Sequence, residues 1–343
     1  MRPITAAPLP TWRDIAALLG STPAEADIAK PWSKDGPFKL FSRSAFAMAA
    51  LAKSFPGPLW LPAIFCHQST LPAREIGANI SFYPVSDDLS PDWAACEEMI
   101  SKGKPALFFL VHYFGFPNPA LLQTREFCDR FGTKLIEDAA HVLRPIAGIG
   151  TVGDAVLWSP HKLLGVPDGA ILTGPLAENI PSPTGASPTG FVWLIKRILQ
   201  KTIPSLLPVK PKEEEYFFED SAPAAPPEAP VMSRMAKRML FAASRRLEIE
   251  AKHRRADEAL LHQALEGRVG VHPLYPDWGE AAPWRAIFIC ERAELAALCF
   301  AELHGKGILV ESWPDLPPEI RADPERYHVS IRLRNSLLAF PLP

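Results

Sequence analysis

The sequence predicts an α/β fold with a large, mostly parallel sheet domain and a small C-terminal α/β domain. Helix-like and strand-like segments alternate at short spacing between about residues 40 and 175. This alternation is typical of a parallel-rich sheet that is covered by helices on both faces. Residues 106–112 (ALFFLVH) form a continuous apolar run, as expected of a strand that is buried on both faces.

The elements of the large domain follow from local signals. Ser44 opens a run of good helix formers over 44–53, and serine is favoured at a helix start. Gly132 ends an amphipathic helix that is predicted over 121–131. Further helices are expected over 68–77 and 91–102, and strands over 59–61, 79–85, 106–112, 134–137, 154–158 and 169–173.

Proline interrupts this rhythm between Pro175 and Pro230. The chain has 38 prolines, about twice the average usage of roughly 5%. Within this region 191–201 (FVWLIKRILQK) is predicted to be an amphipathic helix, and 221–230 (SAPAAPPEAP) an extended or disordered linker. One face of the helix is apolar and the other polar: Phe191, Leu194, Ile195, Ile198 and Leu199 against Lys196, Arg197 and Gln200.

The small domain is predicted from the C-terminal pattern. A long helix is expected over 232–265, closed by Gly267. The elements after it are strands over 269–272, 285–290 and 308–312, and helices over 293–304 and 331–339. The predicted division is a large domain over 1–175, a proline-rich insertion over 176–231 and a small domain over 232–343.

Composition excludes several classes of protein. Hydrophobic residues make up 48% of the chain, enough for a sizeable core. The net charge is −2 without a Lys/Arg block, so we expect no nucleic-acid partner. We find no signal peptide and no bilayer-spanning run, and expect a cytoplasmic protein. The cysteines lack metal-ligand spacing and predict buried free thiols and no metal: Cys66, Cys96, Cys128, Cys290 and Cys299.

Two segments carry the residue types of a chemical site. In KLIEDAAH (134–141) a buried strand delivers Asp138 at its carboxyl end, where α/β sheets bind their ligands. In GDAVLWSPHKLLGVPDGAIL (153–172) a turn after Trp158 presents Lys162 among apolar and turn-forming residues. Lys162 is either an exposed surface lysine or a desolvated amine whose lowered pKa lets it attack an aldehyde.

These segments resemble enzymes of fold type I that depend on pyridoxal phosphate (PLP), in particular the DegT family of sugar aminotransferases. IEDAAH at 136–141 is the most diagnostic part. The stretch 43–70 is similar to the family's phosphate-binding helix start, strand and active-site loop. GTVGDAVLWSPHKLLG at 150–165 is similar to its lysine segment, and also to class V aminotransferases and cysteine desulfurases. The resemblance is close over roughly residues 40–175.

The resemblance implies a role for each matching residue. Lys162 would form the Schiff base and move the substrate proton, Asp138 would keep the pyridine nitrogen protonated, and His141 would lie near the phenolic oxygen. The helix start would bind the phosphate, Ser159 would add a hydroxyl, and Phe65 or His67 would stack on the ring. The implied cofactor-binding set is Arg43, Ser44, Ala45, Phe65, His67, Asp138, His141, Ser159 and Lys162.

Three positions depart from the family pattern. Arg43 precedes Ser44 where the family usually has Gly before Ser or Thr, and Leu157 stands where it usually has a phosphate-binding serine. Ser233 stands before an Arg-Met pair, where the family has an asparagine that reaches the neighbouring subunit. The source of the phosphate contacts therefore stays open.

The resemblance implies a homodimer that moves an amino group from glutamate to a keto group of a nucleotide-linked sugar, in polysaccharide biosynthesis. One alternative is a PLP-dependent lyase or desulfurase acting on an amino acid. That enzyme would need a mobile-loop cysteine, which is not evident, and an arginine such as Arg332 or Arg334 for the substrate carboxylate. Another alternative is a catalytically degenerate homologue that binds a partner or membrane through 191–230.

Four further features each have two interpretations. His112 either fills a buried polar position or binds a ligand, and His161 is a turn residue or a cofactor contact. Trp313 belongs to the core or a small-domain lid, or contacts substrate. The helix within 191–203 packs on a dimer partner or shields the site, or it rests peripherally on an anionic membrane through its basic residues.

Overall fold

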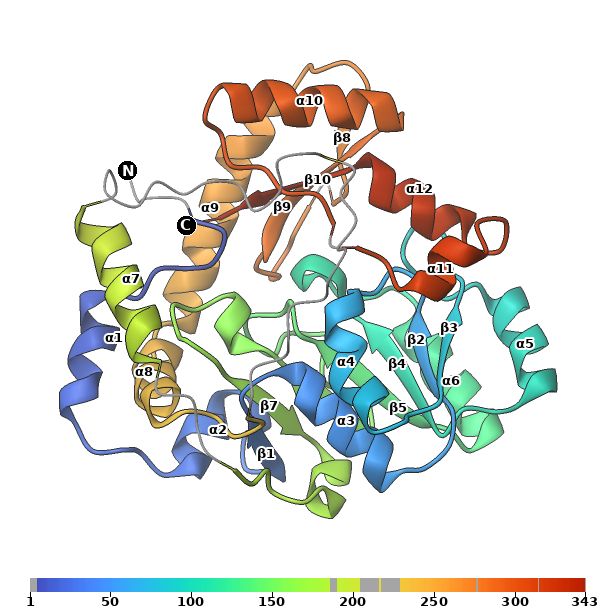
Figure 1. The fold of residues 1–343 in the computed structure, drawn as a ribbon, viewed down its shortest axis with the longest axis horizontal. Helices are drawn as coiled ribbons and strands as arrows, with labels where there is room; N and C mark the ends of the chain where they lie inside the picture. The colour runs from blue at the N-terminus through green and yellow to red at the C-terminus, as the bar shows by residue number, and fades with distance from the viewer. Residues whose placement is uncertain are drawn as a thin grey trace.

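A computed structural model describes residues 5–185, 190–203, 216, 229–275, 277–313 and 315–342. Its large sheet has seven strands, of which β7 alone runs opposite to the other six (Figure 1). The predicted α/β class with a mostly parallel sheet is confirmed. In spatial order the strands are β1 (Phe38–Phe41), β7 (Ala170–Thr173), β6 (Ala155–Trp158), β5 (Lys134–Ala139), β4 (Leu107–Val111), β2 (Leu59–Pro62) and β3 (Ile80–Tyr83).

Helices bury both faces of this sheet. In β6, Leu157 belongs to the core that contains α3 (Ser44–Ser54), whereas its neighbour Trp158 belongs to the core that contains α2 (Glu25–Ser33) and α8 (Arg234–Ser244). Successive side chains of a strand point to opposite faces, so these two cores lie on opposite sides of the sheet. The remaining helices between strands are α4 (His67–Glu75), α5 (Trp93–Lys102) and α6 (Leu121–Phe131).

Several predicted boundaries agree with the structure because local signals fix them. The helix predicted over 121–131 matches α6 at both ends. Gly132 follows it with φ of 66°, and its N–H donates to the carbonyl of Cys128. Glycine adopts this left-handed conformation without steric cost and so closes a helix. The predicted helix at 44–53 is likewise α3, one residue longer.

The C-terminal region required three corrections. The helix predicted over 232–265 is two helices, α8 and α9 (Leu247–Leu265), because the chain turns at Arg246, whose guanidinium bonds to Asp14. The strand predicted over 308–312 is only an isolated bridge between Glu311 and Ala339. The helix predicted over 331–339 ends earlier, as α12 (His328–Ser336), because the residues that follow pair with β9 as strand β10 (Leu337–Pro341).

The small sheet is antiparallel, in the order β10, β9 (Arg285–Cys290), β8 (Val271–Pro273). Helix α10 (Ala293–Gly305) packs on β9 and β10, and α11 (Pro318–Ala322) packs on α12. Among the described residues, no helix is both long and apolar enough to cross a bilayer.

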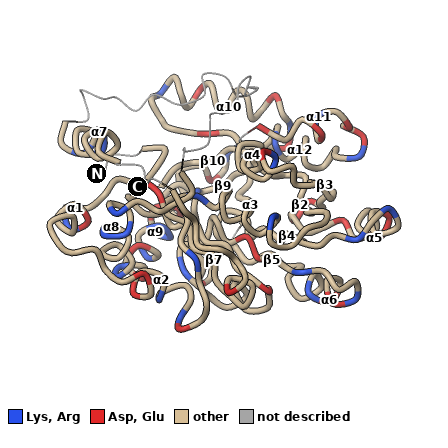
Figure 2. Tube along the Cα trace, turned by 60° about the horizontal axis from the view of Figure 1, so that its bottom comes forward, with Lys and Arg blue, Asp and Glu red and all other residues tan. Residues whose placement is uncertain are grey.

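Three helices gather at one end of the molecule in both views (Figures 1 and 2). They are α1 (Trp12–Ala16), α8 and α7 (Phe191–Thr202). A helix was predicted within 191–201, and α7 confirms it. Most of the linker predicted over 221–230 lies outside the described residues, and so does Pro204.

Candidate active site

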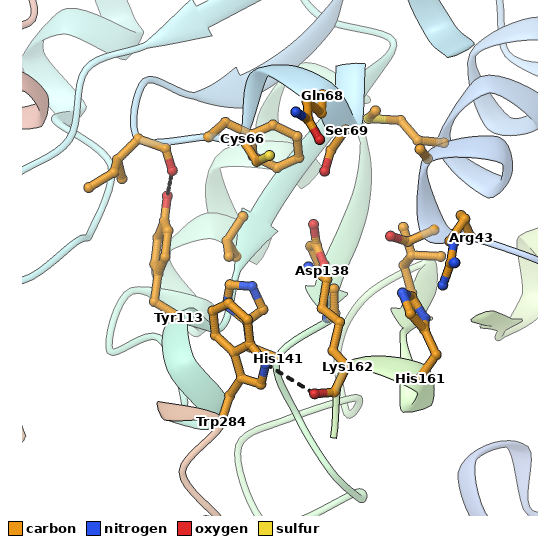
Figure 3. A pocket seen from close by; sticks show the side chains of 18 of the residues that line it. Arg43, Cys66, Gln68, Ser69, Tyr113, Asp138, His141, His161, Lys162 and Trp284 are labelled. Atoms are coloured by element: carbon orange, nitrogen blue, oxygen red, sulfur yellow. Dashed lines mark hydrogen bonds between the residues drawn. The ribbon is translucent and has the colours of Figure 1, made fainter. Parts of the chain in front are cut away.

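A cavity of about 360 Å³ contains Lys162 and Asp138. Asp138 lies near the carboxyl end of β5, and Lys162 lies in the turn η3 (Pro160–Lys162) just after β6. Strand ends of this kind are where open α/β sheets place ligands. Figure 3 shows both residues between Arg43 and His161 on one side and Tyr113 and Trp284 on the other.

Most of the predicted cofactor-binding residues meet in this cavity. Two do not line it. His67 is the first residue of α4 and interacts electrostatically with Asp315 and Glu319. Its backbone N–H donates to the Asp315 carbonyl. Ser159 is fully buried, and its hydroxyl has no partner among the described residues. Those that line the cavity are Arg43, Ser44, Ala45, Phe65, Asp138, His141 and Lys162.

Lys162 and Asp138 shift each other's ionisation. Burial lowers the pKa of Lys162, and the Asp138 carboxylate opposes this shift. Burial raises the pKa of Asp138, while Lys162 and the Ala140 N–H, which donates to Oδ1 at 2.9 Å, oppose it. The Lys162 amine is therefore neutral at a lower pH than a surface lysine, which makes it a better nucleophile.

The lowered pKa of Lys162 predicts how the protein captures an aldehyde. The rate of covalent capture of PLP by PLP-free protein should rise with pH and level off below the ordinary lysine value of 10.5. Asp138→Asn should move this profile to lower pH, because the Asp138 charge raises the pKa of Lys162. Stopped-flow absorbance at a series of pH values measures the rate. A profile still rising past 10.5 would contradict the prediction.

His141 lies under an indole ring from the C-terminal part of the chain. The rings of His141 and Trp284 stack with centroids 4.0 Å apart and an interplanar angle of 12°. The Phe114 N–H donates to His141 Nδ1 at 3.3 Å, which places the imidazole proton on Nε2. Burial, with Lys162 and Arg285 nearby, holds the pKa of His141 well below its usual range. His141 is therefore a neutral hydrogen-bond donor through Nε2.

Two residues that sequence analysis missed hold the lysine turn. The Trp284 indole N–H donates to the Lys162 carbonyl at 3.2 Å. The buried guanidinium of Arg254, on α9, donates to the Leu163 carbonyl at 2.8 Å and to the Trp284 carbonyl at 3.3 Å. Burial lowers the pKa of Arg254 to about 10. No local pattern marks either residue, because their roles arise from contacts that are distant in sequence.

The start of α3 has the features of an anion site. Arg43 is its N-cap residue, and its side chain makes no capping bond. The first N–H groups of a helix point outward and favour negative charge, and here Ser44 and Ala45 bring them to the cavity wall. The Arg43 guanidinium donates to the Pro167 carbonyl at 3.1 Å. Burial lowers the pKa of Arg43, and Asp168 opposes that shift.

The structure locates three residues for which the sequence left two roles open. His161 lines the cavity and its Nδ1 lies 2.9 Å from the Gly169 carbonyl, so it is both a turn residue and part of the wall. Trp313 is 4% exposed and also lines the cavity. His112 fills a buried polar position, where its Nε2 lies 3.0 Å from Glu137.

Glu137, next to Asp138 on β5, accepts hydrogen bonds from His112 and from the loop that follows this strand. Burial alone raises its pKa, but the bond from His112 and the N–H groups of Gly150 and Val152 outweigh burial and hold the pKa below its ordinary value. The Gly153 N–H adds a bond of 2.6 Å. The carboxylate thus fixes the loop between β5, which carries Asp138, and β6, which leads into the turn of Lys162.

Glu137→Ala should lower the free energy of unfolding by about 3–5 kcal/mol, because it leaves buried donors without an acceptor. The pKa is depressed in the folded state, so this contribution is complete above the unfolded value of 4.5 and is lost as pH falls through the folded value. Urea unfolding of wild type and variant should therefore differ at neutral pH and converge in acid. A constant difference across this range would contradict the assignment.

The residues required by a lyase or desulfurase are only partly in place. Cys66 lines the cavity, so one of the five cysteines does lie near the site. Cys66 is nevertheless the N-cap residue of α4 and lies in the short connection 63–66 after β2, not in a long loop. Arg332 pairs with Asp87 at the surface, and Arg334 lies over the Tyr216 ring. Neither arginine lines the cavity.

No protein-family model matches the chain. No curated protein sequence matches it either.

Solved structures, in contrast, match almost the whole chain. Spr1654 from Streptococcus pneumoniae, named as a sugar aminotransferase and solved in its PMP form, has 15% identity and a TM-score of 0.72, covering 99% of this chain and 92% of that one. DesI, solved with its TDP-sugar product, has 17% identity and a TM-score of 0.71, covering 99% and 88%. A DegT DnrJ EryC1 StrS aminotransferase from Brucella abortus has 17% identity and a TM-score of 0.66, covering 96% and 90%.

These likenesses span 96–99% of the chain and therefore include both sheets. The chain therefore has the fold of the sugar aminotransferases, PLP-dependent fold type I.

Proposed function

We propose that this chain is a PLP-dependent sugar aminotransferase of the DegT kind, which moves an amino group from glutamate to a keto group of a nucleotide-linked sugar. The observation that carries the proposal is the pairing of buried Lys162 with buried Asp138 in one cavity beside the uncapped start of α3. The PMP form of Spr1654 and the TDP-sugar product of DesI support the cofactor and the substrate class.

Each side chain then has a defined task. PLP, when bound, supplies an electron sink that stabilises negative charge at the substrate carbon. Lys162 Nζ holds the cofactor, takes the α-proton of the donor and returns it. Asp138 keeps a proton on the pyridine nitrogen, and the Nε2–H of His141 donates to the phenolic oxygen. Phe65, on the wall of the cavity, covers a face of the ring.

Arg43 replaces the phosphate contact that Leu157 cannot make. Both residues line the cavity, and Leu157 offers no hydrogen bond where the family usually has serine. The guanidinium of Arg43 supplies charge-assisted donors to a phosphate. The first N–H groups of α3 add theirs.

Arg43→Gly should weaken PLP binding by about tenfold to a hundredfold, the loss of a charged hydrogen bond worth roughly 1.5–3 kcal/mol. Binding of pyridoxal, which has no phosphate, should change little. Fluorescence titration of PLP-free protein with each compound measures both constants. Leu157→Ser added to Arg43→Gly should recover part of the PLP affinity. An equal loss for PLP and pyridoxal would contradict a phosphate role.

The half-reactions test the proposed activity. Glutamate added to the PLP-loaded protein should convert the visible absorption of bound PLP to that of pyridoxamine phosphate and release 2-oxoglutarate. A nucleotide-linked keto sugar should then restore the first spectrum. If neither glutamate nor any other amino acid changes the spectrum, the aminotransferase proposal is wrong. Release of pyruvate or sulfide would instead favour the lyase.

We propose the same setting that the resemblance implies. The enzyme acts as a cytoplasmic homodimer in polysaccharide biosynthesis. Its large PLP-binding domain spans 1–175 and its small domain spans 232–343, of which α8 packs on the large sheet. Sedimentation of the purified protein tests the dimer.

A further inference from the structure

Helix α7 presents apolar side chains to solvent. Phe191, Val192 and Ile195 are 61%, 80% and 44% exposed. Gln200, a polar residue, is instead buried, and Arg197 donates to its side-chain oxygen at 3.0 Å. A surface helix normally buries its apolar side and exposes its polar side. In α7, by contrast, three apolar side chains stay exposed on its outer face.

Two further apolar side chains are exposed on α1 and η1, at the same end of the molecule (Figure 1). Trp12, on α1, is 55% exposed, and the Lys201 ammonium of α7 lies 5.8 Å from the centre of its ring. Leu19, at the end of the short helix η1 (Ala17–Leu19), is 93% exposed. We call this set the α7 surface: Trp12, Leu19, Phe191, Val192 and Ile195.

Basic residues gather at the same end of the molecule (Figure 2). Helices α7 and α8, with the two residues after α8, contain eight Lys or Arg and no Asp or Glu, in a chain whose net charge is −2. Among the described residues, ion pairs join two of the eight to acids, Lys237 to Glu25 and Arg246 to Asp14. The eight are Lys196, Arg197, Lys201, Arg234, Lys237, Arg238, Arg245 and Arg246.

Three of these eight residues line a hollow beside α1 and α8, together with an arginine of α1. Its volume is about 600 Å³, and four guanidinium groups line it, with Phe241 and Ile249. Arginine binds phosphate through paired donors. The hollow therefore suits an anionic group that lies at the edge of an apolar layer. The four residues are Arg13, Arg238, Arg245 and Arg246.

We propose that the α7 surface docks on a bilayer that contains anionic lipids. Helix α7 has 12 residues and spans about 18 Å, too short to cross a membrane, so it lies in the plane of the interface. Its apolar side chains enter the boundary between headgroups and acyl chains, and the basic residues contact lipid phosphates. This docking is independent of the aminotransferase activity and would hold the enzyme at a membrane.

Charge decides between a membrane and a second copy of the chain. A two-fold dimer built on the α7 surface would bring two identical basic regions together, and like charges across an interface oppose association. An anionic bilayer supplies the opposite charge and an apolar layer at once. The same charge argument predicts that salt weakens docking.

Vesicle co-sedimentation of the full-length, PLP-loaded protein tests the proposal. Wild type should bind vesicles of phosphatidylglycerol and phosphatidylcholine, bind less in high salt, and ignore pure phosphatidylcholine. Val192→Asp should lower the partition coefficient by at least about tenfold, and Lys196→Gln by about fivefold. Leu122→Asp is the matched control, since Leu122 is 68% exposed on α6, and it should bind like wild type.

The contrary outcomes are distinct. Equal binding by Val192→Asp and Leu122→Asp would overturn the α7 surface as the docking site, and no binding by wild type would overturn the proposal itself. If Val192→Asp instead lowers the molecular mass measured by light scattering in the absence of vesicles, the α7 surface joins two copies of the chain, and the membrane proposal is wrong.

Discussion

Lys162→Ala should abolish covalent attachment of PLP and lower turnover by about 10⁴-fold or more, the combined loss of the attachment point and of the residue that moves the proton. The cavity offers no substitute among the residues that line it, because its other nitrogen bases, His141 and His161, have pKa values well below the usual range and are bonded to the backbone. Borohydride reduction followed by mass spectrometry detects attachment, and single-turnover spectra with glutamate give the rate.

Two variants control this experiment. Lys102→Ala removes an exposed lysine that pairs with Glu98 on α5, and it should behave like wild type. Lys162→Arg keeps a cation beside Asp138 but cannot be attached, so it should retain reversible PLP binding without turnover. Turnover by Lys162→Ala within tenfold of wild type would show that another residue carries the chemistry.

The fold could be predicted wherever a signal is local. The run 106–112 indicates a buried strand by composition alone, and β4 lies within it. Gly132 fixes the end of α6. The break between α8 and α9 could not be predicted, because it depends on a contact between Arg246 and Asp14, 232 residues apart in sequence. Strand β10 exists because β9 pairs with it, and neither partner reveals the pairing by itself.

The candidate site divides in the same way. Asp138 lies near the end of one buried strand and Lys162 follows another. The strand pattern is visible in the sequence, so their meeting in one cavity could be expected. Trp284 reaches Lys162 across 122 residues, and Arg254 reaches Leu163 across 91. Such contacts depend on how the C-terminal part packs against the large sheet. Periodicity and caps describe single elements and carry no information about that packing.

Asp138→Asn should lower turnover by about 10²–10⁴-fold while the protein still attaches PLP through Lys162. Asparagine has the same shape as aspartate and can keep the bond from the Ala140 N–H, which the Asp138 Oδ1 accepts at 2.9 Å. It has no negative charge, however, and cannot hold a proton on the pyridine nitrogen. Rate constants for the glutamate half-reaction and the dissociation constant of PLP separate the two effects.

The outcome distinguishes a chemical role from a structural one. If Asp138 acts on the cofactor, the rate constant falls far more than PLP affinity or thermal stability, and Asp129→Asn, at an exposed carboxylate on α6, changes none of them. If Asp138 only supports the strand end, stability and affinity fall together and the rate per bound cofactor stays near wild type. Asp138 is buried, and the Lys162 charge opposes the rise that burial causes in its pKa. A buried carboxylate that served packing alone would lower the stability of the fold more than a neutral side chain would. These observations favour the first result.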